Sequence, residues 1–276
     1  MSGEKLILVT NDDGFNSEGI CAAYQSVKGL GKVVISAPAT QKSGVGRSIS
    51  IFDPLRVTEA KIKSGEKAYA VGGTPSDSVI LGLHEITKGI GKPDLILSGF
   101  NLGENLSTDS ITTSGTIGAA LEGASNDIPA IAVSLQIGYQ ESKKIIDKES
   151  DEYKSIKVAI IIVRNIVKSV LENGFPPNTD LLNVNIPRGV NEETPLVVAR
   201  LSRKYFQTDV ETRLDPKNVP YYWISGGVLT SDEDGTDVHE LHKGCITITP
   251  VSLDSTAFSD MEYFEKLIPE YKCKND

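Results

Sequence analysis

The sequence predicts an α/β protein built on a doubly wound, mostly parallel sheet, and two observations carry this prediction. The first is a series of short, nearly continuous apolar runs, such as residues 5–10 (KLILVT) and 94–98 (DLILS), which are typical of strands buried on both faces. The second is that helix-like segments, such as residues 17–30 and 154–172, separate these runs. Strands that alternate with helices favour right-handed crossovers and a parallel sheet.

The first third of the chain contains a complete strand–helix–strand unit. We expect strands at 5–10 and 32–37, the second stopped by Pro38, and a helix over 17–30 that starts at Ser17. The chain then continues with a loop at 39–48, extended structure within 49–62, a strand at 68–71, and a helix from Pro75 to about Lys88 with Thr74 as its N-cap.

The remaining elements continue the alternation until Pro187. We predict a strand at 94–98, a long polar loop at 99–113, a helix of small residues at 114–125, a strand at 129–135, an amphipathic helix at 154–172 and a strand at 180–186. Beyond Pro187 we expect two hairpin arms at 195–204 and 219–225 with a charged linker between them, an irregular acidic stretch at 229–240, a strand at 245–250 and a closing helix at 260–270. This change of texture divides the chain into a core, residues 1–187, and a C-terminal extension, residues 188–276.

Charge and cysteine content exclude several classes of function. The net charge of −9 argues against binding a nucleic-acid polymer, which needs a basic face, but it permits a small phosphorylated substrate if a metal ion reverses the local field. The cysteines, Cys21, Cys245 and Cys273, lack the spacing of a disulfide framework or a zinc site. The apolar run at 6–9 is too short for a signal peptide, and no run approaches the roughly 20 residues of a membrane span. We therefore expect a cytoplasmic protein that binds no membrane.

Polar residues gather where the predicted strands end, which is where open parallel sheets bind ligands. Asp12 and Asp13 follow the first strand, and Gly14 permits a turn that lets both carboxylates face one cavity. Two close carboxylates repel, and a bound divalent cation would remove that cost. Asn-Asp-Asp-Gly is also good turn chemistry, so an ordinary Asx turn is the alternative for this motif.

Neutral oxygen donors follow two further strands at the same edge. Ser43 lies in the loop after the second strand, and Asn101 lies after the strand at 94–98. Together with the acidic pair they form a hard oxygen site that suits one Mg²⁺ or Mn²⁺ ion and leaves positions for water and phosphate. Ser114, Gly115 and Thr116 open a helix whose free N–H groups suit an anion, although ordinary N-capping is the alternative.

These stretches together resemble the SurE family of survival-protein nucleotidases. The matching segments occur in the family's order over nearly the whole chain: Ile7-Leu-Val-Thr-Asn-Asp-Asp-Gly14, Ser43-Gly-Val-Gly-Arg-Ser-Ile49, Gly73-Thr-Pro-Ser-Asp77, Ser98-Gly-Phe-Asn-Leu-Gly-Glu-Asn105, Ser114-Gly-Thr-Ile-Gly-Ala-Ala-Leu-Glu-Gly123, Asn183-Val-Asn-Ile-Pro187, Gly235-Thr-Asp237 and Ile246-Thr-Ile-Thr-Pro250. The resemblance implies a Rossmann-like core whose C-terminal extension is used in dimers and tetramers. It also implies metal-dependent hydrolysis of nucleoside 5′- and 3′-monophosphates.

The resemblance further implies roles for individual residues. Its metal ligands match Asp12, Asp13, Ser43 and Asn101, and its phosphate-side loop matches Asn105 and the turn at Ser114, Gly115 and Thr116. We also expect Asn11, next to the acidic pair, to bind phosphate or substrate. Phe100 departs from the family, which usually has an aliphatic residue there. We expect Phe100 to alter the pocket wall while leaving the Asn101 amide free.

The preferred chemistry is metal-assisted hydrolysis in which Asp12 or Asp13 takes a proton from the attacking water. An aspartyl-phosphate route through Asp12 is less favoured, because the two acids are adjacent rather than spaced Asp-x-Asp. A non-catalytic nucleotide-binding module on the same fold is the alternative from another class. A dehydrogenase is disfavoured because the glycine run at 44–46 is incomplete.

We also expect a homodimer or homotetramer, because aromatic residues crowd the predicted hairpin. Packing of these residues on the chain's own core is the alternative.

Overall fold

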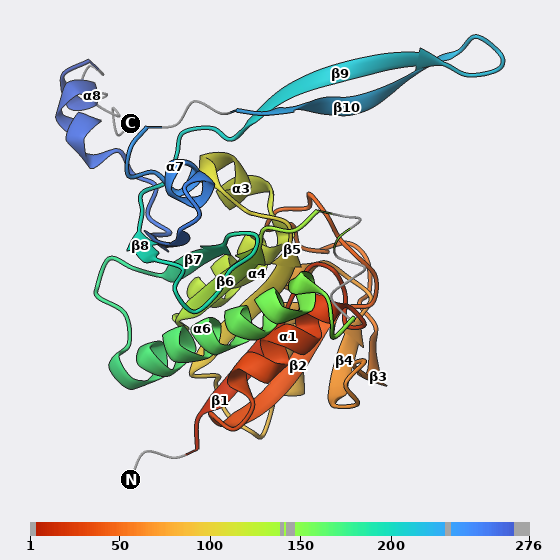
Figure 1. Cartoon of the computed structure of the whole chain (residues 1–276), viewed down its shortest axis with the longest axis vertical. Coiled ribbons are helices and arrows are strands. Elements are labelled where there is room, and N and C mark those ends of the chain that lie inside the picture. The colour runs from red at the N-terminus through yellow and green to blue at the C-terminus, as the bar shows by residue number, and fades with distance from the viewer. Residues whose placement is uncertain (1–3, 139–140, 142–146, 230–232, 268–276) are drawn as a thin grey trace, which may run out of the picture.

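The computed structural model describes residues 4–138, 141, 147–229 and 233–267, and within them one nine-stranded mixed sheet forms the centre of the protein. Its strand order is β3-β4-β2-β1-β5-β6-β7-β11-β8 (Figure 1). In chain order the strands are β1 (Leu6–Thr10), β2 (Lys32–Pro38), β3 (Val57–Lys61), β4 (Lys67–Val71), β5 (Leu95–Leu102), β6 (Ala130–Leu135), β7 (Leu181–Ile186), β8 (Leu196–Val198) and β11 (Ile246–Val251).

The six strands from β4 to β7 in that order run parallel, which confirms the predicted α/β class and mostly parallel sheet. β3 and β11 run antiparallel to β4 and β7, respectively, and β8 lies parallel to β11 at the far edge. β1 leads to β2 on one side, and its other neighbour, β5, begins a separate series towards β7. The direction of the strand order reverses between β1 and β5, and doubly wound sheets bind their ligands outside such a switch point.

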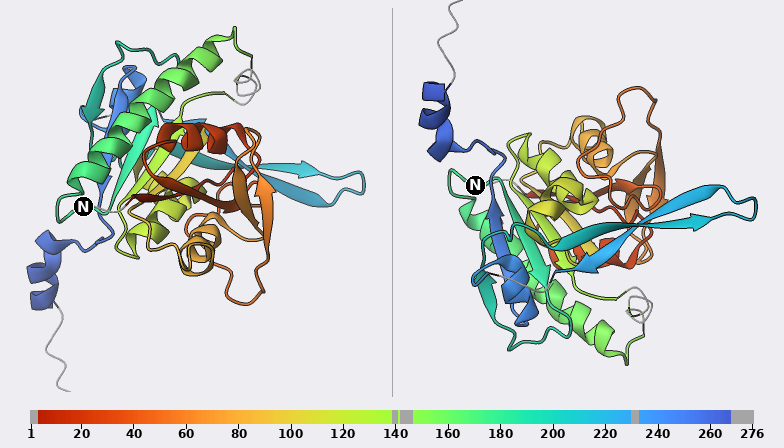
Figure 2. Two further views of the ribbon diagram at one scale, coloured as in Figure 1. Left: turned by 90° about the horizontal axis from the view of Figure 1, so that it is seen from below. Right: turned by 90° about the horizontal axis from the view of Figure 1, so that it is seen from above.

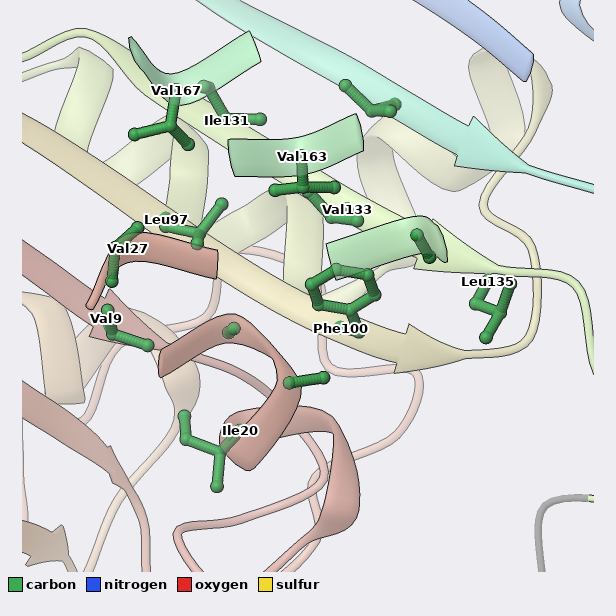
Figure 3. Close-up of a cluster of buried hydrophobic side chains, with 14 of the residues drawn as sticks. Val9, Ile20, Val27, Leu97, Phe100, Ile131, Val133, Leu135, Val163 and Val167 are labelled. Carbon is green, nitrogen blue, oxygen red and sulfur yellow. The ribbon is translucent and has the colours of Figure 1, made fainter. Parts of the chain in front are cut away.

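Helices cover both faces of the sheet (Figure 2). α1 (Glu18–Val27) and α6 (Asp151–Asn173) supply apolar side chains to one buried cluster, which also contains Val9, Leu97 and Val133 (Figure 3). α2 (Pro75–Leu81) and α4 (Gly115–Ala124) pack on the opposite face, around Leu8 and Ile96. Side chains alternate along each buried strand and therefore pack into apolar clusters on both faces of the sheet.

The helix starts follow the predicted capping chemistry. Ser17 accepts a hydrogen bond from the Ile20 amide at 3.2 Å. Thr74 and Asp77 form a capping box in which each side chain accepts from the other's backbone N–H, with Pro75 at the first helical position. α2 continues into a π-helical turn, η1 (Gly82–Ile86), so the predicted helix ends two residues earlier than expected.

The predicted first arm of the hairpin is wrong. The arms are β9 (Phe206–Leu214) and β10 (Pro220–Val228), which pair in antiparallel register and project from the body (Figure 1). Residues 196–198 instead form β8 and pair with β11. The charged stretch expected to be a linker is itself a strand, because this arm exposes both faces and can carry charges on either.

The predicted loop at 99–113 is also wrong at both ends. β5 continues to Leu102, because Asn101 and Leu102 pair with Ser134 and Leu135 of β6 after a register shift. Residues Ser107–Thr113 form α3, whose first turn is held by contacts with the C-terminal part of the chain rather than by its own propensity.

The C-terminal segment contains further elements. Part of the stretch expected to be irregular is helix α7 (Asp237–His242), and the closing helix appears as η2 (Phe258–Asp260) and α8 (Met261–Leu267). Positions 268–270 of that prediction lie outside the described residues. β8 and β11 join the same sheet as the core, and the division at residue 187 stays a prediction. In the part of the chain that the structure describes, Cys21 and Cys245 are free thiols, and no helix has the length and apolar character to cross a membrane.

Candidate active site

The acidic pair sits in a turn that Asn11 builds at the end of β1. Asn11 is fully buried; its Oδ1 accepts from the Gly14 amide at 3.1 Å, and its Nδ2 donates to the Gly14 carbonyl and to Ser17 Oγ. Gly14 has φ +95°, a conformation that glycine adopts without strain. These contacts hold the Asn11 side chain in the turn beneath the site, and its part in substrate binding stays a prediction. The predicted Asx turn is therefore present, and it presents the two acids.

Asp12 lies directly against the start of α4. Its side chain is 6% exposed, and its Oδ1 accepts a 2.5 Å hydrogen bond from Thr116 Oγ1. A Cβ at Gly115 would lie 2.8 Å from the Asp12 Cβ and 3.0 Å from the Lys42 carbonyl oxygen. Only glycine fits at this position, so the small residue that opens α4 is what lets the helix approach the carboxylate.

Asp13 reaches the loop after β2 through a residue that the sequence analysis missed. Gln41 Nε2 donates to Asp13 Oδ1 at 3.1 Å and to Ser43 Oγ at 3.2 Å, so one amide joins two predicted metal ligands. Asp13 Oδ2 is buried and has no hydrogen-bond partner among the described residues. The Leu102 backbone amide lowers the pKa of Asp13 and so favours its charged form. A buried carboxylate oxygen without a partner is a position that a cation would satisfy.

Burial dominates the electrostatics of the pair. It raises the pKa of Asp12 to about 6, with the charge of Asp13 adding to the rise and the Thr116 hydroxyl opposing it. Burial also raises the pKa of Asp13, against the opposing effects of the Leu102 amide and Gln41. Both carboxylates thus resist ionisation in the metal-free chain, which is the condition in which a bound divalent cation has most effect.

Asn101 lies at the end of β5, one residue before Leu102, and its Nδ2 donates to the Gly103 carbonyl at 2.6 Å. That bond turns the amide nitrogen away as a donor and leaves the side-chain oxygen as the atom suited to a cation. Among the described residues no group of three His, Cys, Asp or Glu side chains could hold a metal. A cation here would depend on Asp12 and Asp13 together with neutral oxygens, a donor set that fits Mg²⁺ or Mn²⁺ with bound water.

Asn105 is held by three buried polar residues, none of which was predicted as part of the site. Asn185 binds both backbone groups of Asn105: its Oδ1 accepts from the amide at 2.8 Å, and its Nδ2 donates to the carbonyl at 3.0 Å. Asn183 donates to the same carbonyl, and Asn105 Nδ2 donates to Ser134 Oγ at 2.9 Å. Polar residues at alternate positions of the buried strand β7 were the signal that could have revealed this cradle.

The hydroxyls of the predicted phosphate turn already have partners. Ser114 is the N-cap of α4 and accepts from the Ile117 amide at 3.2 Å, while the Thr116 hydroxyl is bound to Asp12. The N-capping alternative is therefore present at Ser114. Any anion at this turn would rely on the backbone amides of Gly115 and Thr116 rather than on these hydroxyls.

Phe100 does not form part of the pocket wall, which corrects the expectation for this residue. It is fully buried in the apolar cluster beneath α1 and α6 (Figure 3). A Cβ at Gly19 would lie 2.0 Å from the Phe100 carbonyl oxygen, so α1 crosses directly over this peptide. The unusual aromatic residue is accommodated by the core, and Asn101 is left at the rim as predicted.

The C-terminal part of the chain braces the loop that carries Asn105. Asp237 is fully buried, and its carboxylate accepts from the Ser107 and Ser202 amides, each at 2.8 Å. Tyr205, at the root of the hairpin, donates its hydroxyl to Glu104 Oε1 at 2.6 Å. The active-site loop and α3 are therefore fixed by residues about one hundred or more positions away in the sequence.

Fold and site together define an α/β protein with a doubly wound sheet that carries an acidic pair, Asp12 and Asp13, and neutral oxygen donors at the switch point of its strand order. Comparison with known proteins is more specific. Residues 7–208 match the family described as Survival protein SurE, and the chain belongs to this family.

Named relatives in this family align with the chain over almost their full length. The chain is 55% identical to a protein named 5′-nucleotidase SurE from Methanosarcina mazei and 56% identical to one of the same name from Methanosarcina acetivorans, each alignment covering 95% of this chain and 97% of the relative. The crystal structure of the SurE protein from Aquifex aeolicus superimposes with a TM-score of 0.76 at 35% identity, covering 95% of this chain and 99% of the other. The predicted family is confirmed.

Proposed function

We propose that this protein is a metal-dependent phosphomonoesterase that hydrolyses nucleoside 5′-monophosphates, and also 3′-monophosphates, to nucleoside and phosphate. The relatives named 5′-nucleotidase SurE support the 5′ activity, since they share more than half of their residues with the chain. The observation that carries the proposal is the buried acidic pair, in which Asp13 Oδ2 lacks a partner and the pKa of Asp12 is raised to about 6.

One divalent ion, Mg²⁺ or Mn²⁺, would be held by Asp12, Asp13, Ser43 and Asn101. When bound, the ion would supply charge to the phosphoryl oxygens and lower the pKa of a coordinated water. Gln41 keeps Asp13 and Ser43 side by side, and Thr116 fixes Asp12 against α4. These bonds restrict the donors before any ion arrives, which lowers the entropy cost of binding.

The substrate phosphate would lie between the start of α4 and the loop that carries Asn105. Backbone amides at the start of α4, those of Gly115 and Thr116, would bind its oxygens. Asn183 and Asn185 fix the Asn105 backbone on the other side. Asp12 or Asp13 would accept the proton of the attacking water. An acid whose pKa is near neutrality suits that task, because it can be ionised and still bind a proton well.

The decisive test is release of inorganic phosphate from a panel of nucleotides, with Mn²⁺ and with EDTA, by the wild-type protein and by Asp12→Asn and Asp13→Asn. We expect turnover by the wild type in Mn²⁺ only, and a loss of at least about a hundredfold in each variant. Asp127→Asn is the matched control, because Asp127 is exposed beyond the far end of α4 and its φ of +55° suits asparagine. Near-wild-type turnover by both variants, or full activity in EDTA, would refute the proposal.

The same panel separates the alternatives. A non-catalytic nucleotide-binding module would bind a nucleotide without releasing phosphate when metal is added. An aspartyl-phosphate route would leave labelled phosphate on the protein after acid quench, and the label would disappear in Asp12→Asn. Turnover without trapped label favours direct attack by water.

We also propose a cytoplasmic homodimer or homotetramer that uses the hairpin as its contact. On β10, Trp223 is 58% exposed and Ile224 is 83% exposed, whereas Tyr205 at the root packs against the chain itself. Apolar side chains this exposed on a projecting arm are stabilised when a second copy covers them. A monomeric mass by light scattering at micromolar concentration would rule this out.

A further inference from the structure

A cavity opens at the carboxyl edge of the sheet, two strands away from the acidic pair that follows β1. It has a volume of about 260 Å³ and lies over the ends of β6 and β7. Its walls include Leu135 at the end of β6 and Ile137 just after it, Arg188 after β7, and Glu152 and Ser155 in the first turns of α6. None of these residues has a part in the metal and phosphate chemistry proposed above.

Strand register places this cavity close to the acids. Leu135 pairs directly with Leu102 across β5 and β6. The Leu102 backbone amide is close enough to the Asp13 carboxylate to lower its pKa. Neighbouring strands are about 4.8 Å apart, and a near hydrogen-bond contact adds roughly 3 Å, so the edge of the cavity lies roughly 8 Å from the carboxylate. A ribose spans such a gap when its phosphate lies at the acids.

The chemistry of the walls disfavours a second anion. Arg188, the cation of the cavity, forms an ion pair with Glu141. Glu152 also faces the space, and its carboxylate has no hydrogen bond or ion pair among the residues that the structure describes. A phosphate here would meet an unpaired negative charge in a half-buried position, which is unfavourable.

A flat, neutral heterocycle fits better. Leu135 and Ile137 offer apolar surface for its faces, while Glu152 and Ser155, spaced i and i+3, present acceptors on one side of α6. A carboxylate without a donor is best satisfied by an amino group, because an ionised carboxylate can only accept. Arg188 remains able to donate through guanidinium N–H groups that Glu141 does not use.

We infer that this cavity is the nucleoside subsite of the enzyme, and that Glu152 with Ser155 recognises the amino-bearing edge of adenine or cytosine. The inference rests on the proposed function, because it assumes that the phosphate of the same nucleotide lies at Asp12 and Asp13. It adds a site for the base and a preference among bases. Nucleotides with an amino group should be turned over better than UMP, whose base offers carbonyls at that edge.

The test compares substrates that share a phosphate and differ in the base. We would measure kcat/KM for AMP, UMP and ribose 5-phosphate, which has no base, with wild-type protein, Glu152→Gln and Ser155→Leu. In Glu152→Gln, the AMP to UMP ratio should fall about tenfold, because a hydrogen bond to a charged group contributes about 1.5 kcal/mol. Ser155→Leu narrows the cavity and should reduce the AMP to ribose 5-phosphate ratio by a similar factor. Glu172→Gln, near the other end of α6, is the matched control and should leave both ratios unchanged.

The possible results distinguish failure of the proposed nucleoside subsite from failure of the proposed nucleotidase activity. Wild-type protein that releases phosphate from ribose 5-phosphate and from no nucleotide would remove the nucleotidase proposal itself. Wild-type protein that hydrolyses AMP, with both ratios unmoved in Glu152→Gln and Ser155→Leu, would overturn the subsite and leave the nucleotidase intact. Circular dichroism of each variant would show that a lower ratio of kcat/KM values does not come from unfolding.

Discussion

Replacing Asp12 by asparagine tests whether burial of a carboxylate beside a second carboxylate governs the behaviour of the site. In the metal-free protein the pKa of Asp12 rises from 3.8 to about 6 on folding. The folded chain therefore holds a proton at pH values where the unfolded chain has released it. Above about pH 6 the folded carboxylate is ionised as well, and its burial then costs about 3 kcal/mol of stability.

The sign of the effect with pH follows from this difference. Between about pH 4 and pH 6 the unfolded state binds fewer protons than the folded state, so the contribution of Asp12 to stability is lost as pH rises through that window. Asparagine keeps an acceptor for the Thr116 hydroxyl but carries no charge. The weaker hydrogen bond offsets about 1 kcal/mol, which leaves an expected gain of about 2 kcal/mol for the variant at pH 8.

The assay is urea unfolding in EDTA at pH 8 and at pH 4, with Asp127→Asn as the control. We expect Asp12→Asn to be more stable than wild type by about 2 kcal/mol at pH 8 and by less than about 0.5 kcal/mol at pH 4. Saturating Mn²⁺ should reverse the order at pH 8, because binding at a hundred times Kd stabilises only the protein that keeps its ligands, by about 2.7 kcal/mol. The reasoning would be refuted if Asp12→Asn were no more stable than wild type at pH 8. It would also be refuted if the difference in unfolding free energy were the same at pH 8 and pH 4.

Three further predictions concern other parts of the molecule. Gly115→Ala places a Cβ 2.8 Å from that of Asp12, so the start of α4 must shift. We expect weaker Mn²⁺ binding by calorimetry and a loss of kcat of about tenfold or more. The control is Gly227→Ala, where a Cβ meets nothing within 4 Å, and it should match wild type. Asn185→Ala removes both hydrogen bonds to the Asn105 backbone and should cost about 1–3 kcal/mol in urea unfolding together with a lower kcat; equal stability and activity would contradict the positioning role. Ile224→Asp charges the exposed face of the hairpin and should shift the light-scattering mass to that of a monomer, with the secondary structure intact by circular dichroism; an unchanged oligomer would exclude this surface as the contact.

Much of the sheet could be predicted from the sequence because its strands are buried on both faces. Continuous apolar runs of five or six residues, such as those of β1 and β6, are too short for most helices and favour a buried strand. The hairpin was misplaced for the opposite reason: β9 is exposed along its entire length, so no hydrophobic pattern marks it. α3 was missed because its first turn is set by Asp237 and by Arg203, which lie far away in the sequence.

The site shows the same division. Asp12, Asp13 and Ser43 were predicted to share a site because acids and hydroxyls that follow strands of a parallel sheet lie at one edge. The structure brings Asp13 and Ser43 together through Gln41, and their role as metal ligands stays a prediction. Gln41 was missed because an exposed glutamine in a polar loop carries no signal of its own, even though it joins two of the predicted ligands. Phe100 was expected to alter the pocket wall because it precedes Asn101, and it is buried in the core instead. Asn11 is buried as well, and its side chain builds the turn that carries the acids. Adjacent residues in extended chain point to opposite sides, which proximity in sequence cannot reveal.

The hydrogen bonds of Asp237 determine where the chain can be truncated without loss of the site. Every residue predicted to bind metal or phosphate lies before position 117, yet this single carboxylate gathers backbone amides from Ser107 and Ser202 and so joins the segment in front of α4 to the far end of the polypeptide. A recombinant fragment cut at residue 187 would retain all of those side chains and leave the amide of Ser107 without its acceptor. Such a truncated protein would contain the full set of ligands and still lack a formed site.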